Sequence, residues 1–157
     1  MTETITLTDG QKARRRWMGI LAKAEPESLA ALCDKAMPDG EPAHEMLRSP
    51  ETGMVMTRGR AGGSGQAFNL GEMTVTRCAV RLPDGTVGQS WVAGRSREHA
   101  RLAALCDGLL QGDAAARIET AIVRPLETAQ AERRERQARK AAATKVDFFT
   151  MVRGEDD

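Results

Sequence analysis

The sequence has little with which to build an aromatic core. Only 3% of its 157 residues are aromatic, and it contains no tyrosine. The core must therefore be made of Leu, Val, Ala and Met side chains. Such a core is soft, because these side chains adapt their packing easily, and it can need help from a partner.

Cysteine and histidine are also scarce. Cys33, Cys78 and Cys106 are widely spaced, form no C-x-x-C pair and are accompanied by only two histidines. A metal site needs clustered ligands, so the pattern argues against a metal centre and predicts buried free thiols in a reducing compartment. We expect a structural or solvent-facing role for His44 and His99, because no sequence signal brings either one beside a nucleophile.

Long apolar runs and an excess of one charge are absent as well. No run approaches the roughly 18 residues of a membrane-spanning helix, and the first 16 residues contain no apolar signal core. The formal net charge is +1, which gives no global indication of nucleic acid, an anionic membrane or acidic substrates. We therefore expect a cytoplasmic protein with no membrane contact.

The length suits one domain that buries roughly 70% of its unfolded surface. The best-specified stretch begins with a β-hairpin, because β-branched residues over Met73–Leu82 favour a strand and Asp84-Gly85 favours a tight turn before the next one. The apolar alternation of the first strand is imperfect. A bulge near Arg77 would restore one apolar face.

An amphipathic helix is predicted over residues 96–111. Ser96 can cap its first free amides, and Glu98 suits the positive end of its dipole. Apolar side chains at helical spacing form one continuous stripe: Leu102, Leu105, Cys106, Leu109 and Leu110. We expect Gly112 to end the helix at the C′ position.

The N-terminal third reads as a helical hairpin over residues 8–37. Thr8 or Asp9 can cap a first helix that runs to about Ala24, and Pro26 suits the first position of a second helix that ends before Pro38. We expect the side chains of residues 14–16 to form a solvated face, with their aliphatic stems over the neighbouring tryptophan.

The segment 43–60 is expected to form two strands joined by a turn at Ser49–Gly53. The glycine-rich run Gly59–Gln66 lacks the lysine and Ser/Thr of a phosphate-binding loop, so it predicts a flexible connection to a strand over Gln66–Leu70.

Beyond residue 112 we expect a short helix capped by Asp113, then a polar helix from Leu126 to about Lys145 with almost no apolar stripe. An apolar tail follows, which either docks on its own domain or anchors another subunit. The candidate interface residues are Arg133, Arg134, Arg136, Phe148, Phe149, Met151 and Val152.

These elements predict an α+β fold, in which an antiparallel sheet of hairpins packs with helices. The expected organisation is a core domain over 1–125, containing the helical hairpin 8–37, strands over 43–93 and the helix 96–111, and a second unit over 126–157 with the basic helix and the tail.

Four strings taken together are more specific than any motif above. They are RRRWMGILAKAEP (14–26), ETGMVMTRGRAGGSGQAFNLGEMTVTRCAVRL (51–82), DGTVGQSWVAGRSREHARLAALCDGLL (84–110) and VDFFTMVRG (146–154). In this order they resemble the PhnG family of the bacterial phosphonate carbon-phosphorus lyase system. The resemblance covers nearly the whole chain.

The resemblance implies a place in a hetero-oligomeric core complex with the subunits PhnH, PhnI and PhnJ. In that pathway the phosphonate first displaces adenine from ATP, and a radical S-adenosylmethionine subunit with an iron-sulfur cluster later cleaves the carbon-phosphorus bond. The family assigns the first chemistry chiefly to PhnI and the second to PhnJ. ATP, S-adenosylmethionine and the cluster are thus expected elsewhere in the complex or pathway, with no cofactor in this chain.

Two alternatives to an accessory subunit stay open. The chain itself can contribute to adenine displacement, with His99, Arg58 and Arg60 as candidates. A weaker alternative is nucleic-acid binding by the basic helix at residues 132–145, which would show a steep salt dependence.

Overall fold

The computed structural model describes residues 6–60 and 65–143. Its elements are α1 (Asp9–Ala22), α2 (Pro26–Ala36), β1 (Glu45–Gly59), β2 (Phe68–Arg81), β3 (Val87–Ala93), α3 (Arg97–Leu109), α4 (Ala115–Ile118), the π-helical turn η2 (Glu119–Val123) and α5 (Arg124–Ala143). The predicted α+β class is confirmed, with an antiparallel sheet in the order β1-β2-β3.

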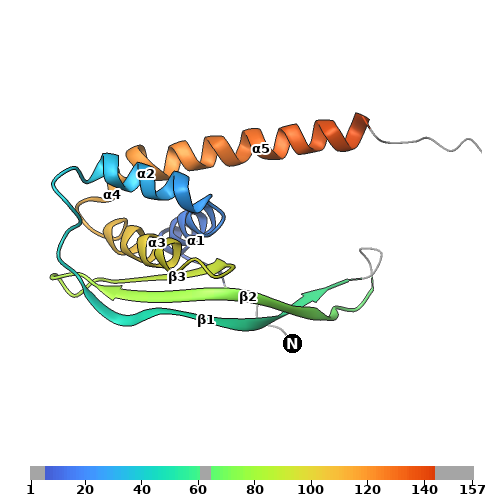
Figure 1. Ribbon diagram of the computed structural model, residues 1–157, viewed down its shortest axis with the longest axis horizontal. Helices are drawn as coiled ribbons and strands as arrows, with labels where there is room; N and C mark the ends of the chain where they lie inside the picture. The colour runs from blue at the N-terminus through green and yellow to red at the C-terminus, as the bar shows by residue number, and fades with distance from the viewer. Residues whose placement is uncertain (1–5, 61–64, 144–157) are drawn as a thin grey trace, which may run out of the picture.

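The molecule has three layers (Figure 1). The sheet forms one outer layer, α1 and α3 cover one of its faces, and α2 lies on the far side of α3 together with the helical segment from α4 to α5. Fully buried side chains come from the sheet and from the helices of both layers: Leu21, Leu29, Val80, Val92, Leu105, Ile118, Ile122 and Val123. In the described ranges, no helix combines the length and apolarity that a bilayer crossing requires.

The N-terminal helices follow the sequence signals closely. Thr8 and Gln11 form a capping box at the start of α1, in which each side chain accepts a hydrogen bond from the other residue's backbone N–H. Pro26 occupies the first position of α2, where its missing N–H costs no helical hydrogen bond. Both predicted helices are confirmed, but they pack mainly on other elements, α1 on α3 and β3, and α2 on α3 and η2.

The central hairpin and helix are also confirmed, with two corrections. Gly85 adopts a φ of 88° in the β2–β3 turn, and the Ser96 side chain accepts the His99 N–H at 3.2 Å to cap α3. The bulge predicted near Arg77 is not in β2, whose register with β3 is unbroken from Val75 to Arg81. The irregularity beside Arg77 lies in β1, between Arg48 and Glu51. Gly112 is not a left-handed C′ residue, since its φ is not positive.

The prediction of two strands over 43–60 is wrong, because β1 is one strand of 15 residues. Its register against β2 shifts between Arg48 and Glu51, so Pro50 lies in an irregularity of an edge strand, where proline is tolerated. Long-range pairing with β2 thus overrides the local turn signal of residues 49–53. The expected strands 66–70 and 73–82 likewise merge into the single β2.

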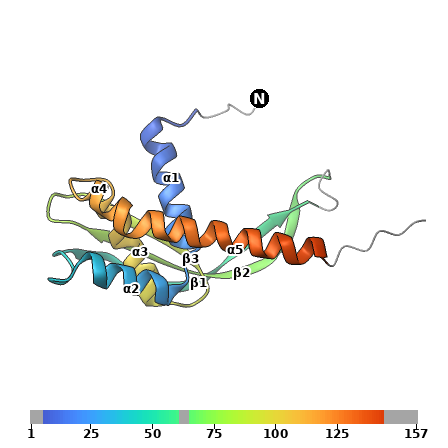
Figure 2. The same ribbon diagram turned by 90° about the horizontal axis from the view of Figure 1, so that it is seen from above.

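The hairpin of β1 and β2 extends beyond the rest of the sheet. Because β3 pairs only with residues 75–81 of β2, the outer part has two strands, and we call residues 53–59 and 68–74 the arm. Figure 2 shows that the arm and α5 project toward the same end of the molecule.

A continuous helical path leads from α4 through η2 into α5. The predicted cap Asp113 is wrong, because α4 begins after Ala114, which makes no side-chain capping bond. Pro125 does not end the path, and the π-helical turn directly before it takes up the irregularity that a proline brings to a helix.

Candidate functional site

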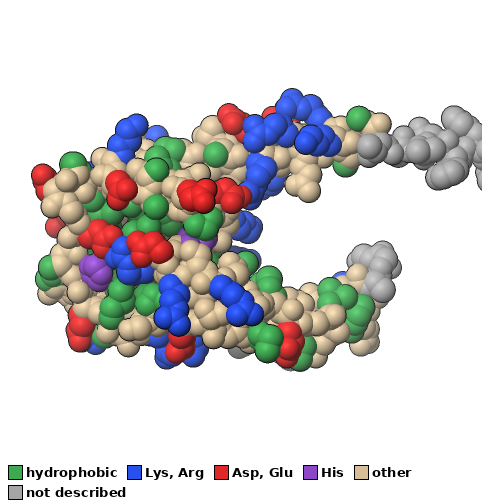
Figure 3. All heavy atoms as spheres, in the orientation of Figure 1, with side chains coloured by type: hydrophobic (Ala, Val, Ile, Leu, Met, Phe, Trp, Pro, Cys, Tyr) green, Lys and Arg blue, Asp and Glu red, His purple; other side chains and the backbone are tan. Residues whose placement is uncertain are grey.

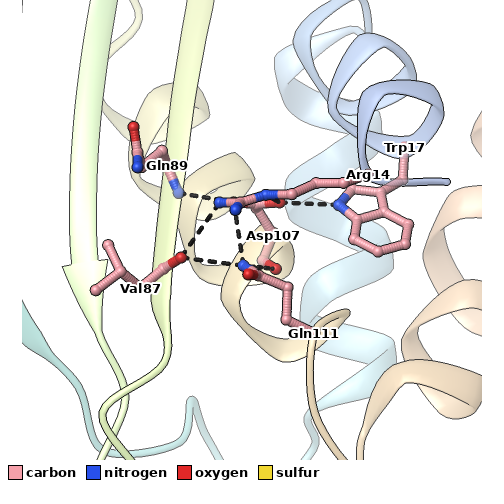
Figure 4. Close-up of polar contacts among 6 residues, drawn as sticks. All are labelled: Arg14, Trp17, Val87, Gln89, Asp107 and Gln111. Carbon is pink, nitrogen blue, oxygen red and sulfur yellow. Dashed lines mark hydrogen bonds and ion pairs between the residues drawn. The ribbon is translucent and has the colours of Figure 1, made fainter. Parts of the chain in front are cut away.

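The most elaborate polar cluster surrounds Asp107 of α3, which is 0% exposed (Figure 4). Its Oδ1 accepts hydrogen bonds from Arg14 Nε at 3.1 Å and Trp17 Nε1 at 2.8 Å. Its Oδ2 accepts from Arg14 Nη2 at 2.7 Å and from the Gln89 backbone N–H at 2.9 Å. These four hydrogen bonds come from α1 and β3, so the carboxylate of Asp107 joins both elements to α3. Its role is structural.

The expectation of a solvated face over residues 14–16 holds for Arg15 and Arg16, which are exposed, and is wrong for Arg14. Arg14 is half-buried against Asp107. Arg16 donates to Glu127 at 2.6 Å and to Glu119 at 2.9 Å, and these two carboxylates raise its pKa above the usual range. Arg15 remains exposed.

Both histidines lie within hydrogen-bond distance of a backbone carbonyl oxygen of the protein. His99 is 4% exposed, and its Nε2 lies 2.8 Å from the Leu21 carbonyl oxygen. The Nδ1 atom of His44 lies 2.8 Å from the Pro42 carbonyl oxygen. The first contact ties α3 to the end of α1, so the ring of His99 is turned into the protein and away from any open surface.

The three cysteines are free and buried, as predicted. The Sγ atoms of Cys33 and Cys106 lie 3.7 Å apart, and this contact together with burial raises the pKa of the Cys106 thiol well above its usual range. Burial also raises the pKa of Cys78. Among the residues that the structure describes, no three His, Cys, Asp or Glu side chains are grouped to hold a metal ion.

Arg58 and Arg60 lie at the far end of the arm. Arg58 donates to the Ala67 carbonyl at 3.4 Å, and Arg60 donates to the Gly65 carbonyl at 3.2 Å. Both residues are exposed, and their contacts tie the end of β1 to the start of β2. The structure therefore separates them from His99, which lies in the core.

The predicted interface arginines lie on the outer half of α5, where residues 131–143 are all exposed. Arg133 forms an ion pair with Glu25, and Arg136 lines a shallow depression beside it. Phe148, Phe149, Met151 and Val152 lie outside the described residues. The interface role of these seven residues remains a prediction.

Arg134 belongs to a groove between α1 and α5 that sequence reasoning missed. We call it the basic groove, and its charged lining consists of Lys12, Arg15, Arg16, Lys23, Arg134 and Glu127. Five cations thus surround one carboxylate, and that carboxylate is paired with Arg16. The groove joins residues more than a hundred positions apart, so only the packing of α5 on α1 creates it.

A second missed surface is the apolar face of the arm. The residue pair Thr52 and Thr76 lies on the helix-covered side of the sheet, and strand alternation carries that side outward along β1. On β2 the same alternation holds only as far as Glu72, because the register shifts between Thr57 and Arg58.

We call the large side chains on this side of the arm, Met54 (68% exposed) and Met56 (56%), the arm face. Beyond the register shift, Phe68 (47%) and Leu70 (62%) lie on the opposite side of the arm, where Leu70 occupies the space beside Gly59. The spacing of two between Met54 and Met56 is the signal that could have revealed the arm face.

Comparisons with known proteins agree with one another. Residues 12–154 match the family model described as phosphonate metabolism protein PhnG. A curated relative from Rhizobium meliloti (strain 1021) is 46% identical over 148 residues, which cover 94% of this chain and 93% of that protein. It is named alpha-D-ribose 1-methylphosphonate 5-triphosphate synthase subunit PhnG.

Proposed function

The chain belongs to the PhnG family, and from this we propose that it is a subunit of a hetero-oligomeric complex that forms a ribose 1-phosphonate 5-triphosphate by displacing adenine from ATP. The observation that carries the proposal is the 46% identity to a subunit of the named synthase over almost the full length of both chains. We propose partners of the PhnH, PhnI and PhnJ types.

The role we propose within the complex is accessory. Both histidines and the buried Asp107 are held by hydrogen bonds within the protein, whereas the basic groove and the arm face are open to solvent. These are contact surfaces by their chemistry, one cationic and one apolar. The bound ATP, the S-adenosylmethionine and the iron-sulfur cluster then belong to other subunits or later steps.

Co-expression tests this proposal. The chain carrying an affinity tag should recover PhnH, PhnI and PhnJ type subunits in fixed ratio, and the purified assembly should release adenine from ATP in the presence of methylphosphonate. Recovery of this chain alone, as a stable monomer beside those subunits, would contradict the proposal.

A second candidate function is direct participation in the adenine displacement. It is favoured by Arg58 and Arg60, because both guanidinium groups stand at the exposed far end of the arm and can reach a partner's site. The variants Arg58→Gln and Arg60→Gln in the purified assembly distinguish the two roles. A large loss of kcat in an intact assembly supports participation, and unchanged turnover leaves the accessory role.

A further inference from the structure

The protein neutralises part of its basic surface with its own carboxylates. Arg14 of α1 forms an ion pair with Asp107, and Arg16 forms ion pairs with both Glu119 and Glu127. Each of these contacts joins α1 to a distant part of the chain. The two arginines are therefore committed to holding the fold together.

Three other cations of the basic groove lack such a partner. Within the described ranges 6–60 and 65–143, the side chains of Arg15, Lys23 and Arg134 form no ion pair and no hydrogen bond. All three residues are exposed. Cations that the fold does not neutralise leave a positive potential at the surface, and this potential attracts anionic groups.

The unpaired cations of α1 stand on either side of a gap. Arg15, Gly19 and Lys23 follow one another at a spacing of four residues, which places them on one side of the helix. Nothing stands within 4 Å of where a Cβ atom of Gly19 would be. At the helical rise of 1.5 Å per residue, the two cations are about 12 Å apart along α1. The wall between them is therefore open to the close approach of another backbone.

The second wall of the basic groove is α5. Figure 2 shows that α1 runs across the direction of α5, and Gln130 Nε2 donates to the Ile20 carbonyl oxygen at 2.7 Å where the two helices meet. Arg134 lies one turn further along the same side of α5. In Figure 3, Lys and Arg side chains gather along α5 and on the wall beneath it. The groove is thus a corner between two helices with unpaired cations on both walls.

We propose that the basic groove binds an acidic segment of a partner subunit. Carboxylates of this segment pair with Arg15, Lys23 and Arg134, and its backbone lies over Gly19. The inference rests on the proposed function as a subunit. It adds to that function the surface of this chain that meets a partner and the chemistry of the partner's surface.

Charge complementarity over an extended surface carries the inference. The unpaired cations are spread over about 12 Å of α1 and across the corner to α5, whereas the oxygens of one phosphate group surround a single atom. Carboxylates one turn apart on a helix, or two residues apart on a strand, are separated by about 5–7 Å. A segment with several such carboxylates therefore matches the spread of the cations.

A second copy of this chain is a poorer occupant. Most carboxylates that the structure describes are already paired within their own chain: Asp9, Glu25, Glu41, Glu45, Glu51, Glu98, Asp107, Glu119, Glu127 and Glu135. Using them in the groove of another copy would break contacts that hold each chain together.

Zero-length cross-linking of the purified assembly tests the inference. A carbodiimide couples a lysine amine to a carboxylate that is in contact with it, and mass spectrometry identifies the joined peptides. We expect Lys23 to be joined to an aspartate or glutamate of one partner subunit. Lys35, an exposed lysine of α2 outside the groove, should not be joined to that segment. Links from Lys23 only to its own chain, residues 155–157 included, links to another copy of this chain, or no link at all overturn the inference.

Charge reversal measures what the cations contribute. Arg15→Glu and Arg134→Glu should each weaken binding of the partner by about tenfold or more and reduce its salt dependence. Lys35→Glu is the matched control and should change binding by less than about threefold. Thermal unfolding of each isolated variant checks that the chain remains folded.

A steric variant tests the gap without removing a charge. Gly19→Leu should weaken binding of the partner by about tenfold, because the leucine side chain occupies the place of the partner's backbone. Gly10→Leu is its control, since Gly10 also lies in α1 with nothing within 4 Å of its Cβ position but does not line the groove. Equal binding of the Gly19 variant and the wild type would contradict the docking over Gly19.

The outcomes also separate a small-anion site and the proposed function. If tripolyphosphate binds the isolated chain through Arg134 while the groove variants assemble normally, the groove holds a small anion and the inference is wrong. If the assembly forms and all three groove variants bind the partner like the wild type, the groove contact is wrong and the subunit role stands. If no assembly forms with the wild-type chain, both fail together.

Discussion

At the scale of single residues, Asp107 joins three elements, because its carboxylate on α3 receives hydrogen bonds from α1 and β3 simultaneously. Replacing one member of a buried ion pair leaves the other without its partner, which costs about 3 kcal/mol. We expect Asp107→Asn to lower the free energy of unfolding by about this amount, as measured by urea denaturation.

Arg15 provides the control, since it neighbours Arg14 on α1 but is exposed. Arg15→Gln should change stability by less than about 0.5 kcal/mol. Equal effects of the two substitutions would show that the Asp107 network does not hold the layers together.

The contact between Glu41 and Arg101 is sensitive to acid. The hydrogen bond from Arg101 lowers the pKa of Glu41 below its usual value of 4.5. A carboxylate with a depressed pKa stabilises the fold above its unfolded-state pKa, and this contribution is lost as the pH falls through the folded-state value.

We therefore expect Glu41→Gln to be less stable than the wild type near neutral pH, with the difference shrinking as the pH falls below about 4.5. Urea denaturation across the acid range measures this. Glu72→Gln on the arm serves as the control, because the structure gives Glu72 no ion pair in the described residues. A pH-independent difference for Glu41→Gln would contradict the prediction.

At the element scale, β3 and α3 approach each other through Gly88 and Gly108. A Cβ atom at Gly88 would collide with the Ala104 carbonyl oxygen and lie 2.9 Å from the Gly108 Cα, both of which are backbone atoms that cannot move aside. We expect Gly88→Ala to lower the free energy of unfolding by about 2–3 kcal/mol, since an overpacked site must shift its backbone.

Gly19→Ala is the matched control. Gly19 lies within α1, and nothing stands within 4 Å of where its Cβ would be. Alanine there should raise stability by about 0.5–1 kcal/mol through its helix propensity. If both alanine variants are stabilised, the close packing of β3 on α3 is refuted.

Local chemistry explains which elements could be predicted from the sequence. The cap at Ser96 and the turn at Gly85 depend on neighbouring residues and were predicted, and Thr8 was one of the two caps predicted for α1. The continuity of β1 was not, because Pro50 and Gly53 signal a turn locally while the pairing with β2 is decided by residues more than twenty positions away.

In the candidate site, too, features that depend on neighbouring residues were predictable and features that depend on distant residues were not. The basic face of α5 was visible as composition, but the role of Arg14 depends on Asp107, which is 93 positions distant. The arm face was missed because alternating apolar residues normally indicate a buried sheet face, and only the shortness of β3 reveals that nothing covers it.

At the scale of the whole molecule, the core and the projections are separate. Buried core residues extend to Leu126, whereas residues 131–143 of α5 are exposed and lead toward a tail outside the described residues. The tail therefore follows a part of α5 that lies outside the buried core. Its two interpretations, docking on its own domain or anchoring another subunit, predict different effects of truncation.

Deletion of residues 146–157 decides between them. We expect the thermal unfolding midpoint of the isolated chain to stay within about 1 °C of the wild type, because stability follows the buried apolar area, while recovery of partner subunits falls severalfold. Deletion of Asp156 and Asp157 alone controls for loss of the acidic end and should leave both measurements unchanged. A truncated chain that unfolds at clearly lower temperature would instead show that Phe148 and Phe149 complete the soft, tyrosine-free core from within the same molecule.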